Sequence, residues 1–190
     1  MEAASLDRQQ GEGKRAEPRG RPLWARTVLA VALTAGVAAG AAMIGTQMAI
    51  GEIASEETAV PGIRSSTWTA VTSISAFLFG EDAFHGSFAV LPVLFGLAWH
   101  FLNAVVLGVI GVALVLVTLG ARPGPLASAV LGFSYGLFLQ VAVLNLAVNA
   151  IDDPNIVYES TPEWSWWLAH AVYGTTLGLV ASWGLRRSAS

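Results

Sequence analysis

Two histidines stand inside apolar stretches of this chain, where charged side chains are missing. His100 lies in the segment WHFLNAVVLGVI, and His170 lies in the segment AHAVYGTTLGLV. An imidazole can donate or accept a hydrogen bond, carry a proton near neutral pH, or bind a metal or haem iron. Ionisable groups inside membrane spans are candidates for function, while a purely structural histidine would make an interhelical hydrogen bond worth about 0.6 kcal/mol.

The two histidines begin the same spacing, His-x6-Leu-Gly, with a small residue four positions after the histidine in each case. Residues at i, i+4 and i+8 share one helix face. Ala104 and Gly108 therefore lie on the face of His100. Gly174 and Gly178 share a face with the second histidine in the same way. Because small residues let membrane helices approach closely, both rings are predicted to face the interior of a helix bundle.

A buried imidazole needs hydrogen-bonding partners, since an unsatisfied polar group in hydrocarbon costs several kcal/mol. Asn103 and Tyr173 stand three positions after the two histidines and are the nearest polar side chains. We therefore expect one small intramembrane polar site that these four side chains share, namely His100, His170, Asn103 and Tyr173. Three interpretations stay open: a structural hydrogen-bond cluster, a solute or proton site, and one haem b with the two histidines as axial ligands.

Other chemistries lack the residues that would perform them. There is no cysteine, which excludes disulfides, thiolate metal sites and cysteine nucleophiles. The chain has no H-E-x-x-H, P-loop or G-x-G-x-x-G motif. We therefore expect no enzyme, no catalytic residues and no metal site. No charged residue lies deep in an apolar stretch, which disfavours a charge-coupled transporter.

The clustering of the charges identifies the elements that carry these residues. The chain has 190 residues, of which 54% are apolar and only 12% charged, about half the charged fraction of soluble domains. A bilayer core about 30 Å thick needs about 20 helical residues, and four stretches almost without charge are long enough. They predict an all-α membrane protein with four transmembrane helices at residues 27–50, 88–118, 125–148 and 163–185. The ends are expected to be a disordered basic tail at residues 1–26 and a short cytoplasmic segment at 186–190.

The segment between the first two spans, Pro61–Phe88, contains a charge-free run that is too short to cross a bilayer. Its apolar residues recur at helical spacing, and serines and threonines fill most of the other positions. This pattern predicts an interfacial amphipathic helix in the first outer loop, with its hydroxyl-rich face turned away from the membrane, or a shallow re-entrant helix.

Basic residues are distributed unequally between the two sides of the predicted bundle. If the N-terminus is inside, only Arg64 of the 10 lysine and arginine residues lies outside. Because basic residues stay on the cytoplasmic side, we expect a multi-pass protein of the cell inner membrane with both termini in the cytoplasm. Its partner is the lipid bilayer, and the basic tail is expected to meet anionic lipids rather than nucleic acid.

The first and third spans share a G-x-x-x-G spacing. Together with the matched histidine helices, this predicts a two-helix unit that occurs twice, as a parallel repeat about an axis normal to the membrane. Small residues of these four spans are expected to pack the helices together, namely Gly36, Gly40, Gly108, Gly132, Gly136, Gly174 and Gly178. The same faces suit a second copy of the chain equally well, so no oligomeric state follows.

These features resemble a family of small four-helix inner-membrane proteins of bacteria and archaea. The resemblance rests on His100-Phe101 in the second span and on the His-x-x-Tyr-Gly-x-x-x-Gly pattern of residues 170–178. It covers residues 27–184, and the long segment 52–87 departs from the compact pattern of the family. The family is mostly uncharacterised, so the resemblance implies an architecture and no particular activity.

The sequence therefore favours a non-enzymatic integral membrane protein with a structural, accessory or envelope role, acting with itself or with another membrane protein. One alternative is a small-solute or proton permease that uses the intramembrane histidine site. A second alternative is a b-type cytochrome with His100 and His170 as axial ligands of haem b. No cofactor is expected unless the second alternative holds.

Overall fold

The elements of the fold come from a computed structural model, which describes residues 21–54, 66–84, 89–148 and 156–188. Every regular element within these ranges is helical: α1 (Arg21–Ala54), α2 (Thr69–Phe79), η1 (Gly80–Phe84), α3 (Val90–Leu119), α4 (Pro125–Leu139), η2 (Gln140–Val148), α5 (Ile156–Glu159) and α6 (Glu163–Ser188). Three segments are long and apolar enough to cross a membrane: Trp24–Ala54, Val90–Leu119 and Pro125–Ala147. The described residues thus form an all-helical protein with three helices that are long and apolar enough to cross a membrane.

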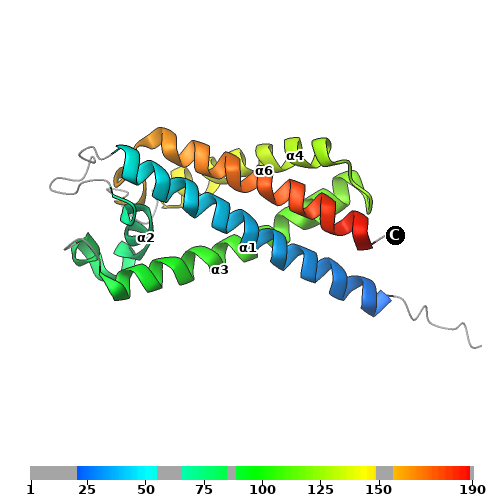
Figure 1. The fold of residues 1–190 in the computed structure, drawn as a ribbon, viewed down its shortest axis with the longest axis horizontal. Helices are drawn as coiled ribbons and strands as arrows, with labels where there is room; N and C mark the ends of the chain where they lie inside the picture. The colour runs from blue at the N-terminus through cyan, green and yellow to red at the C-terminus, as the bar shows by residue number, and fades with distance from the viewer. Residues whose placement is uncertain (1–20, 55–65, 85–88, 149–155, 189–190) are drawn as a thin grey trace, which may run out of the picture.

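Four long helices, α1, α3, α4 with η2, and α6, run lengthwise and give the molecule its elongated shape (Figure 1). We call the end where α1 begins and α6 ends the terminal end; the turn between α3 and α4 also lies there. We call the opposite end, where α2, η1 and α5 lie, the cap end. Because the first and last helices start and finish at the same end, the described chain passes along the bundle an even number of times.

The first helix starts earlier than the sequence predicts. α1 includes residues 21–26, which were expected to belong to the disordered tail. Pro22 stands in its first turn, where a helix has no use for the missing N–H and where the fixed φ of proline suits it. The tail boundary is therefore wrong for residues 21–26, and residues 1–20 lie outside the described part of the chain.

Local signals set the turn between α3 and α4. Gly120 ends α3 with a φ of 80°, and its N–H donates to the carbonyl of Leu116 at 3.0 Å. Glycine adopts this left-handed conformation without the strain of a Cβ atom. Pro125 then occupies the first turn of α4. The hydroxyl of Ser182 donates to the carbonyl of Pro123 at 2.9 Å, so the turn is tied to α6.

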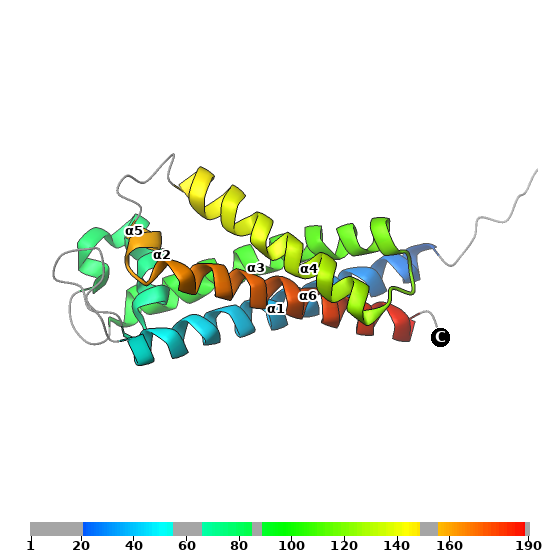
Figure 2. The same cartoon turned by 90° about the horizontal axis from the view of Figure 1, so that it is seen from above.

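The third long helix changes its winding part-way along. α4 continues into the π-helix η2 at Gln140, a change that the sequence did not lead us to expect. The side chain of Gln140 is buried, and its Nε2 donates to Oδ1 of Asn145 at 3.0 Å. η2 leans away from the helices beside it as it approaches the cap end (Figure 2). π-Helical stretches are rare and often occur at functional sites.

α6 has 26 residues, enough to cross a bilayer, but it is not among the three segments that qualify by apolar composition. It packs against α1 and α4 and also touches α3. Its buried side chains accordingly include polar ones, among them Ser165, His170 and Ser182. A helix that is enclosed by other helices does not need an apolar residue on every face.

The short helix α2 lies across the cap end, but its polarity is the reverse of the expectation. Its hydroxyl side chains are buried, with Ser73 and Ser75 fully enclosed, while Leu78 is exposed. The hydroxyl of Ser73 donates to the carbonyl of Ala70 at 3.0 Å, and other hydroxyls of α2 also donate to carbonyls three or four residues earlier. Because these groups are satisfied within their own helix, they can be buried without a partner elsewhere. The expectation of an outward hydroxyl-rich face is therefore wrong.

α2 and the residues just before it pack closely against α3 and α1. A Cβ atom on Gly96 of α3 would lie 2.1 Å from the carbonyl oxygen of Val71. A Cβ atom on Gly51 of α1 would lie 2.2 Å from the carbonyl oxygen of Ser66. Glycine at these two positions lets α2 close the cap end against α1 and α3, because no side chain keeps the backbones apart.

Candidate functional site

A cavity of about 120 Å³ lies between the four long helices. Its lining comes from α1, α3, α4, η2 and α6: Met43, His100, Asn103, Ala104, Leu107, Leu139, Val143, His170 and Tyr173. All four residues that the sequence assigned to a shared polar site are among them. The two exposed residues of the lining, Asn103 and Val143, belong to α3 and η2, so the mouth of the cavity lies between these helices.

His100 binds the neighbouring helix α1. Its Nε2 lies 2.9 Å from the carbonyl oxygen of Gly40. A carbonyl can only accept, so Nε2 carries the proton in this contact and, in the neutral ring, Nδ1 keeps the lone pair. The ring of Phe101 stands edge-on to the imidazole, with 5.4 Å between the ring centroids. His100 therefore joins α3 to α1 at the wall of the cavity.

His170 makes its hydrogen bond within its own helix. Its Nδ1 lies 2.9 Å from the carbonyl oxygen of Trp166, one turn earlier in α6. Nδ1 is therefore the donor, and the neutral ring offers Nε2 as an acceptor. The indole of Trp166 is buried next to it, with 6.4 Å between the ring centroids. The two histidines thus hold opposite tautomers on two sides of one cavity.

The expected polar partners do not bond to the histidines. Tyr173 donates its hydroxyl to the carbonyl of Ala104 at 2.8 Å, from α6 to α3. The amide of Asn103 donates to the carbonyl of Trp99 at 2.8 Å, in its own helix. Main-chain carbonyls, which every residue possesses, satisfy both imidazoles in place of side chains. The expectation that Asn103 and Tyr173 supply these bonds is therefore wrong, although both lie at the cavity.

One residue that the sequence did not single out ties the same helices together. Tyr135 of α4 donates its hydroxyl to the carbonyl of Leu107 at 2.9 Å. Tyr135 thus joins α4, and Tyr173 joins α6, to carbonyl groups of α3 that lie about one turn apart. The available signal was a tyrosine between two glycines of a close-packing helix face, since a buried phenol almost always finds a partner.

Gln47 of α1 is a buried polar residue outside the cavity. Its side chain is 1% exposed, and neither its Oε1 nor its Nε2 has a hydrogen-bond partner among the described residues. An unsatisfied amide in an apolar setting costs a few kcal/mol. No function for it follows from the residues around it.

The sequence contains one G-x-S-x-G spacing, Gly132–Gly136, in which Ser134 stands at the nucleophile position. This spacing bears on the expectation that the chain has no catalytic residues. That motif acts where the serine sits on a sharp turn between a strand and a helix. Ser134 instead lies in the middle of α4, exposed, with its hydroxyl donating to the carbonyl of Val130 at 3.0 Å. The local geometry therefore does not supply a nucleophile elbow.

Haem b does not fit between the two histidines. Pockets for ligands of drug size or larger occupy about 300–1,000 Å³, and this cavity has about 120 Å³. Axial ligation also needs a free imidazole nitrogen facing the iron. The Nε2 of His100 is instead directed at the carbonyl of Gly40. Among the described residues no group of three or more His, Asp or Glu side chains is placed to hold a metal ion.

Glycines bring α4 and α6 together beside the cavity. A Cβ atom on Gly132 would lie 2.1 Å from the carbonyl oxygen of Gly174, and one on Gly178 would lie 2.0 Å from that of Ser128. A Cβ atom on Gly136 would lie 2.0 Å from the carbonyl oxygen of His170. The two backbones are therefore in direct contact over several turns.

The same positions of the other helix pair bring α1 and α3 together. A Cβ atom on Gly36 would lie 2.9 Å from the carbonyl oxygen of Ala104, and one on Gly40 would lie 2.7 Å from the Cβ of Ala104. A Cβ atom on Gly108 would lie 2.6 Å from the Cα of Gly36 and 3.5 Å from the carbonyl oxygen of Ala32. In each pair, the G-x-x-x-G helix faces the histidine and the small residues that follow it.

Comparisons with protein-family models, with curated proteins and with solved structures find no match for this chain. The resemblance to small four-helix inner-membrane proteins stays a prediction.

Proposed function

We propose that this chain is a non-enzymatic, four-span protein of the cell inner membrane with an accessory role, which binds a small neutral polar molecule in the cavity between its two intramembrane histidines. The observation that carries the proposal is the convergence of His100, His170, Asn103 and Tyr173 on that cavity. A non-enzymatic role agrees with the setting of these residues, which are held by carbonyls rather than by a base or nucleophile.

The fourth span is α6. Its length of 26 residues exceeds the roughly 20 needed to cross a bilayer, and other helices enclose its polar face. α1 and α6 also reach the same end of the bundle, as an even number of spans requires (Figure 1). We place the terminal end in the cytoplasm because Arg122, Arg186 and Arg187 lie there, while the described acidic residues belong to the cap end.

An internal repeat is part of the proposal. Gly132 and Gly136 contact Gly174 and the backbone of His170, as Gly36 and Gly40 contact Ala104 and the ring of His100. In both helix pairs, the positions that the glycines contact occur in the same order along α3 and along α6. This correspondence supports a two-helix unit that occurs twice in parallel, with the cavity between its two copies.

The size and chemistry of the cavity favour a small neutral ligand. Water takes about 30 Å³ per molecule in the liquid, so a cavity of about 120 Å³ matches a few waters or one compact solute. Its polar groups are uncharged hydrogen-bonding groups, and no Asp, Glu, Lys or Arg lines it. The lone pair on Nε2 of His170 can accept a hydrogen bond from such a ligand.

The topology is tested with single-cysteine variants, for which the cysteine-free chain is a ready background. A membrane-impermeant maleimide applied to intact cells should label Glu52→Cys and Asp82→Cys at the cap end. Ala121→Cys and Ser188→Cys should react only after the membrane is permeabilised. If Ala121→Cys and Ser188→Cys react from opposite sides, α6 does not span and the four-span proposal is wrong.

The ligand site is tested by nitrogen NMR of the imidazoles in detergent, with urea and acetamide as probes. A ligand of a few atoms gains at most about 1.5 kcal/mol per heavy atom, so millimolar binding is expected. Both probes should shift the Nε2 resonance of His170 in the natural chain but not in Val143→Phe, which blocks the mouth of the cavity. Ser134→Ala, on the outer surface of α4, is the control and should respond like the natural chain.

Absence of any shift with either probe would contradict the ligand site. A flux measurement then separates binding from transport. Proteoliposomes should release urea no faster than protein-free liposomes, because close backbone contacts between the helices continue from the cavity toward the terminal end. A urea flux that His100→Asn abolishes would replace the accessory role with the permease alternative.

A further inference from the structure

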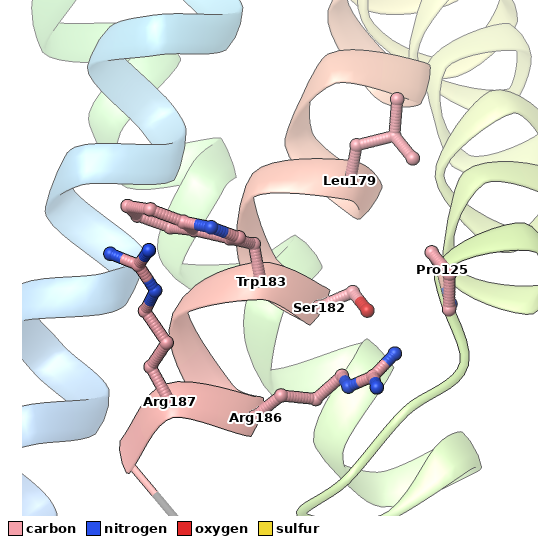
Figure 3. A pocket seen from close by; sticks show the side chains of 6 residues that line it. All are labelled: Pro125, Leu179, Ser182, Trp183, Arg186 and Arg187. Atoms are coloured by element: carbon pink, nitrogen blue, oxygen red, sulfur yellow. The ribbon is translucent and has the colours of Figure 1, made fainter.

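A second hollow lies far from the histidine cavity, at the terminal end of α6. It has a volume of about 500 Å³ and lies between the last turns of α6 and the start of α4 (Figure 3). Its lining combines apolar, hydroxyl and cationic side chains: Pro125, Leu179, Ser182, Trp183, Arg186 and Arg187. We call this hollow the arginine groove.

Two arginine side chains belong to the lining of the groove. Arg186 extends from α6 across the groove toward Pro125 (Figure 3). The guanidinium of Arg187 lies over the indole of Trp183, 4.0 Å from the ring centroid. A cation–π contact of this kind keeps an exposed arginine in one orientation. One guanidinium therefore lies on the α4 side of the last turns of α6, and the other lies on the opposite side, held against Trp183 (Figure 3).

The surroundings of the groove add positive potential, and no Asp or Glu of the described residues lies at this end of the bundle. The first turn of α4, which begins at Pro125, directs the positive end of its helix dipole to the groove. Within the described residues, all Asp and Glu side chains belong to elements of the cap end: Glu52, Glu81, Asp82, Glu159 and Glu163. An anion in the arginine groove would thus meet attraction that no nearby described carboxylate cancels.

The apolar part of the lining decides which anion fits. Leu179 and Trp183 are 44% and 56% exposed, and they continue the groove from the arginines toward the middle of the bundle. Indole rings occur where membrane and water meet, and arginines there extend their charge toward the headgroups. A lipid satisfies both parts at once, with its phosphate between the arginines and its acyl chain along Leu179.

We propose that the arginine groove is a binding site for one anionic phospholipid of the inner leaflet. The inference rests on the proposed placement of the terminal end at the cytoplasmic side, and it is independent of the histidine cavity. Both arginines contact the phosphate, Ser182 lies at the floor, and Leu179 and Trp183 contact the chain. A zwitterionic lipid with a choline headgroup gains less, because the arginines repel the cationic end of its headgroup.

Native mass spectrometry of the full chain in detergent tests the proposal with phosphatidylglycerol and phosphatidylcholine of the same acyl chains. Phosphatidylglycerol should bind one to one and more tightly than phosphatidylcholine. Each arginine near an anionic headgroup is worth about 1 kcal/mol, which corresponds to a factor of about five in affinity. Arg186→Gln and Arg187→Gln should each weaken phosphatidylglycerol binding about fivefold, and the double variant about 25-fold.

Matched variants keep the test specific to the groove. Arg26→Gln removes an exposed arginine of α1 at the same end and should change the affinity less than about twofold. The double variant with lysine at positions 186 and 187 should retain most of the preference for phosphatidylglycerol. All variants should elute as the natural chain does on size-exclusion chromatography, since the substituted side chains are exposed.

Three results would overturn the proposal: equal binding of the two lipids, an unchanged affinity in the double glutamine variant, or full displacement of the lipid by millimolar inorganic phosphate. The last result would identify a soluble phosphate site instead. These outcomes are distinguishable from a failure of the proposed topology, which the cysteine labelling reports by itself.

Discussion

Substituting Gly132 with alanine tests the close contact between α4 and α6. A Cβ atom at this position would lie 2.1 Å from the carbonyl oxygen of Gly174 and 3.1 Å from the backbone nitrogen of Gly178. Cβ atoms in proteins essentially never lie within 3.0 Å of a heavy atom of a packed neighbouring segment. The obstacle is backbone rather than a flexible side chain, so the two helices have to separate by about 1 Å.

The size of the effect follows from that separation. A gap of about 0.5–1 Å already forfeits a quarter to a half of the dispersion energy across a packed surface. Membrane helices have little else to hold them together, because lipid tails are as apolar as their side chains. We expect Gly132→Ala to lower the free energy of unfolding by about 1–3 kcal/mol, the range of over-packing in well-packed cores.

Gly45 supplies the matched control, because it lies in α1 and a Cβ atom there would have no heavy atom within 4 Å. Gly45→Ala should leave stability unchanged or raise it by up to about 1 kcal/mol, since alanine is the better helix former. Gly36→Ala, whose nearest contact is 2.9 Å, should fall between the two.

Equilibrium unfolding by SDS in mixed micelles, followed by circular dichroism, gives the free energy of unfolding of each of the three alanine variants. The reasoning is refuted if Gly132→Ala is as stable as the natural chain, or if Gly45→Ala loses as much stability as Gly132→Ala. The first result would mean that α4 and α6 are not in backbone contact, and the second would mean that the loss does not come from that contact.

Three further predictions follow from the same contacts. Nitrogen NMR of the imidazoles should show His100 protonated at Nε2 and His170 protonated at Nδ1, and identical tautomers would contradict the two carbonyl contacts. Tyr173→Phe should destabilise the protein by about 0.6–2 kcal/mol in the same SDS assay, the range for interhelical hydrogen bonds in membranes; a neutral effect would mean that its hydroxyl bonds elsewhere. Added haemin should give the purified protein no Soret band that survives washing, and a stable band would require a larger cavity than the one between the histidines.

The long helices and the shared cavity could be predicted because both depend on periodic signals in the sequence. Charge-free stretches of sufficient length mark the helices whatever their partners are. The spacing of His100, Ala104 and Gly108 defines one face of α3, and a face of small residues is drawn toward another helix. Since the same spacing recurs at His170, the two rings could be expected on the same interior.

The hydrogen-bond partners of the rings could not be predicted in this way. Every residue has a carbonyl group, so the sequence carries no mark for the carbonyls of Gly40 and Trp166 that the rings use. The π-helix was missed for a related reason. A π-helical stretch depends on how the backbone accommodates its neighbours, and the segment from Gln140 to Val148 has no proline or glycine to announce it.

The amphipathic pattern of α2 identified which residues share a face but not which face is inside. Serine and threonine are polar by composition, so the hydroxyl-rich side was expected to face outward. A helix offers each hydroxyl a carbonyl three or four residues earlier, and Ser75 uses that of Thr72 at 2.6 Å. Once its hydroxyls are satisfied in this way, the side chain behaves as a small residue that permits close packing.

The two histidines bond differently, and the residue four positions after each of them also differs between α3 and α6. At the position four after the histidine, α3 has Ala104 where α6 has Gly174. The alanine methyl holds α1 and α3 apart, so that the ring of His100 reaches across to the carbonyl of Gly40. Without a methyl, α6 approaches α4 until a Cβ on Gly136 would lie 2.0 Å from the backbone of His170.

That approach leaves no room for a ring between α4 and α6, so the second imidazole turns to the carbonyl of Trp166 in its own helix. Its Nε2 is then the nitrogen that carries the lone pair, beside the cavity that the other ring closes on the far side. The cavity is therefore unsymmetrical, because the imidazole of His100 joins two helices and that of His170 bonds within its own helix. The proposed function uses this asymmetry, because it assigns Nε2 of His170 as an acceptor for the ligand.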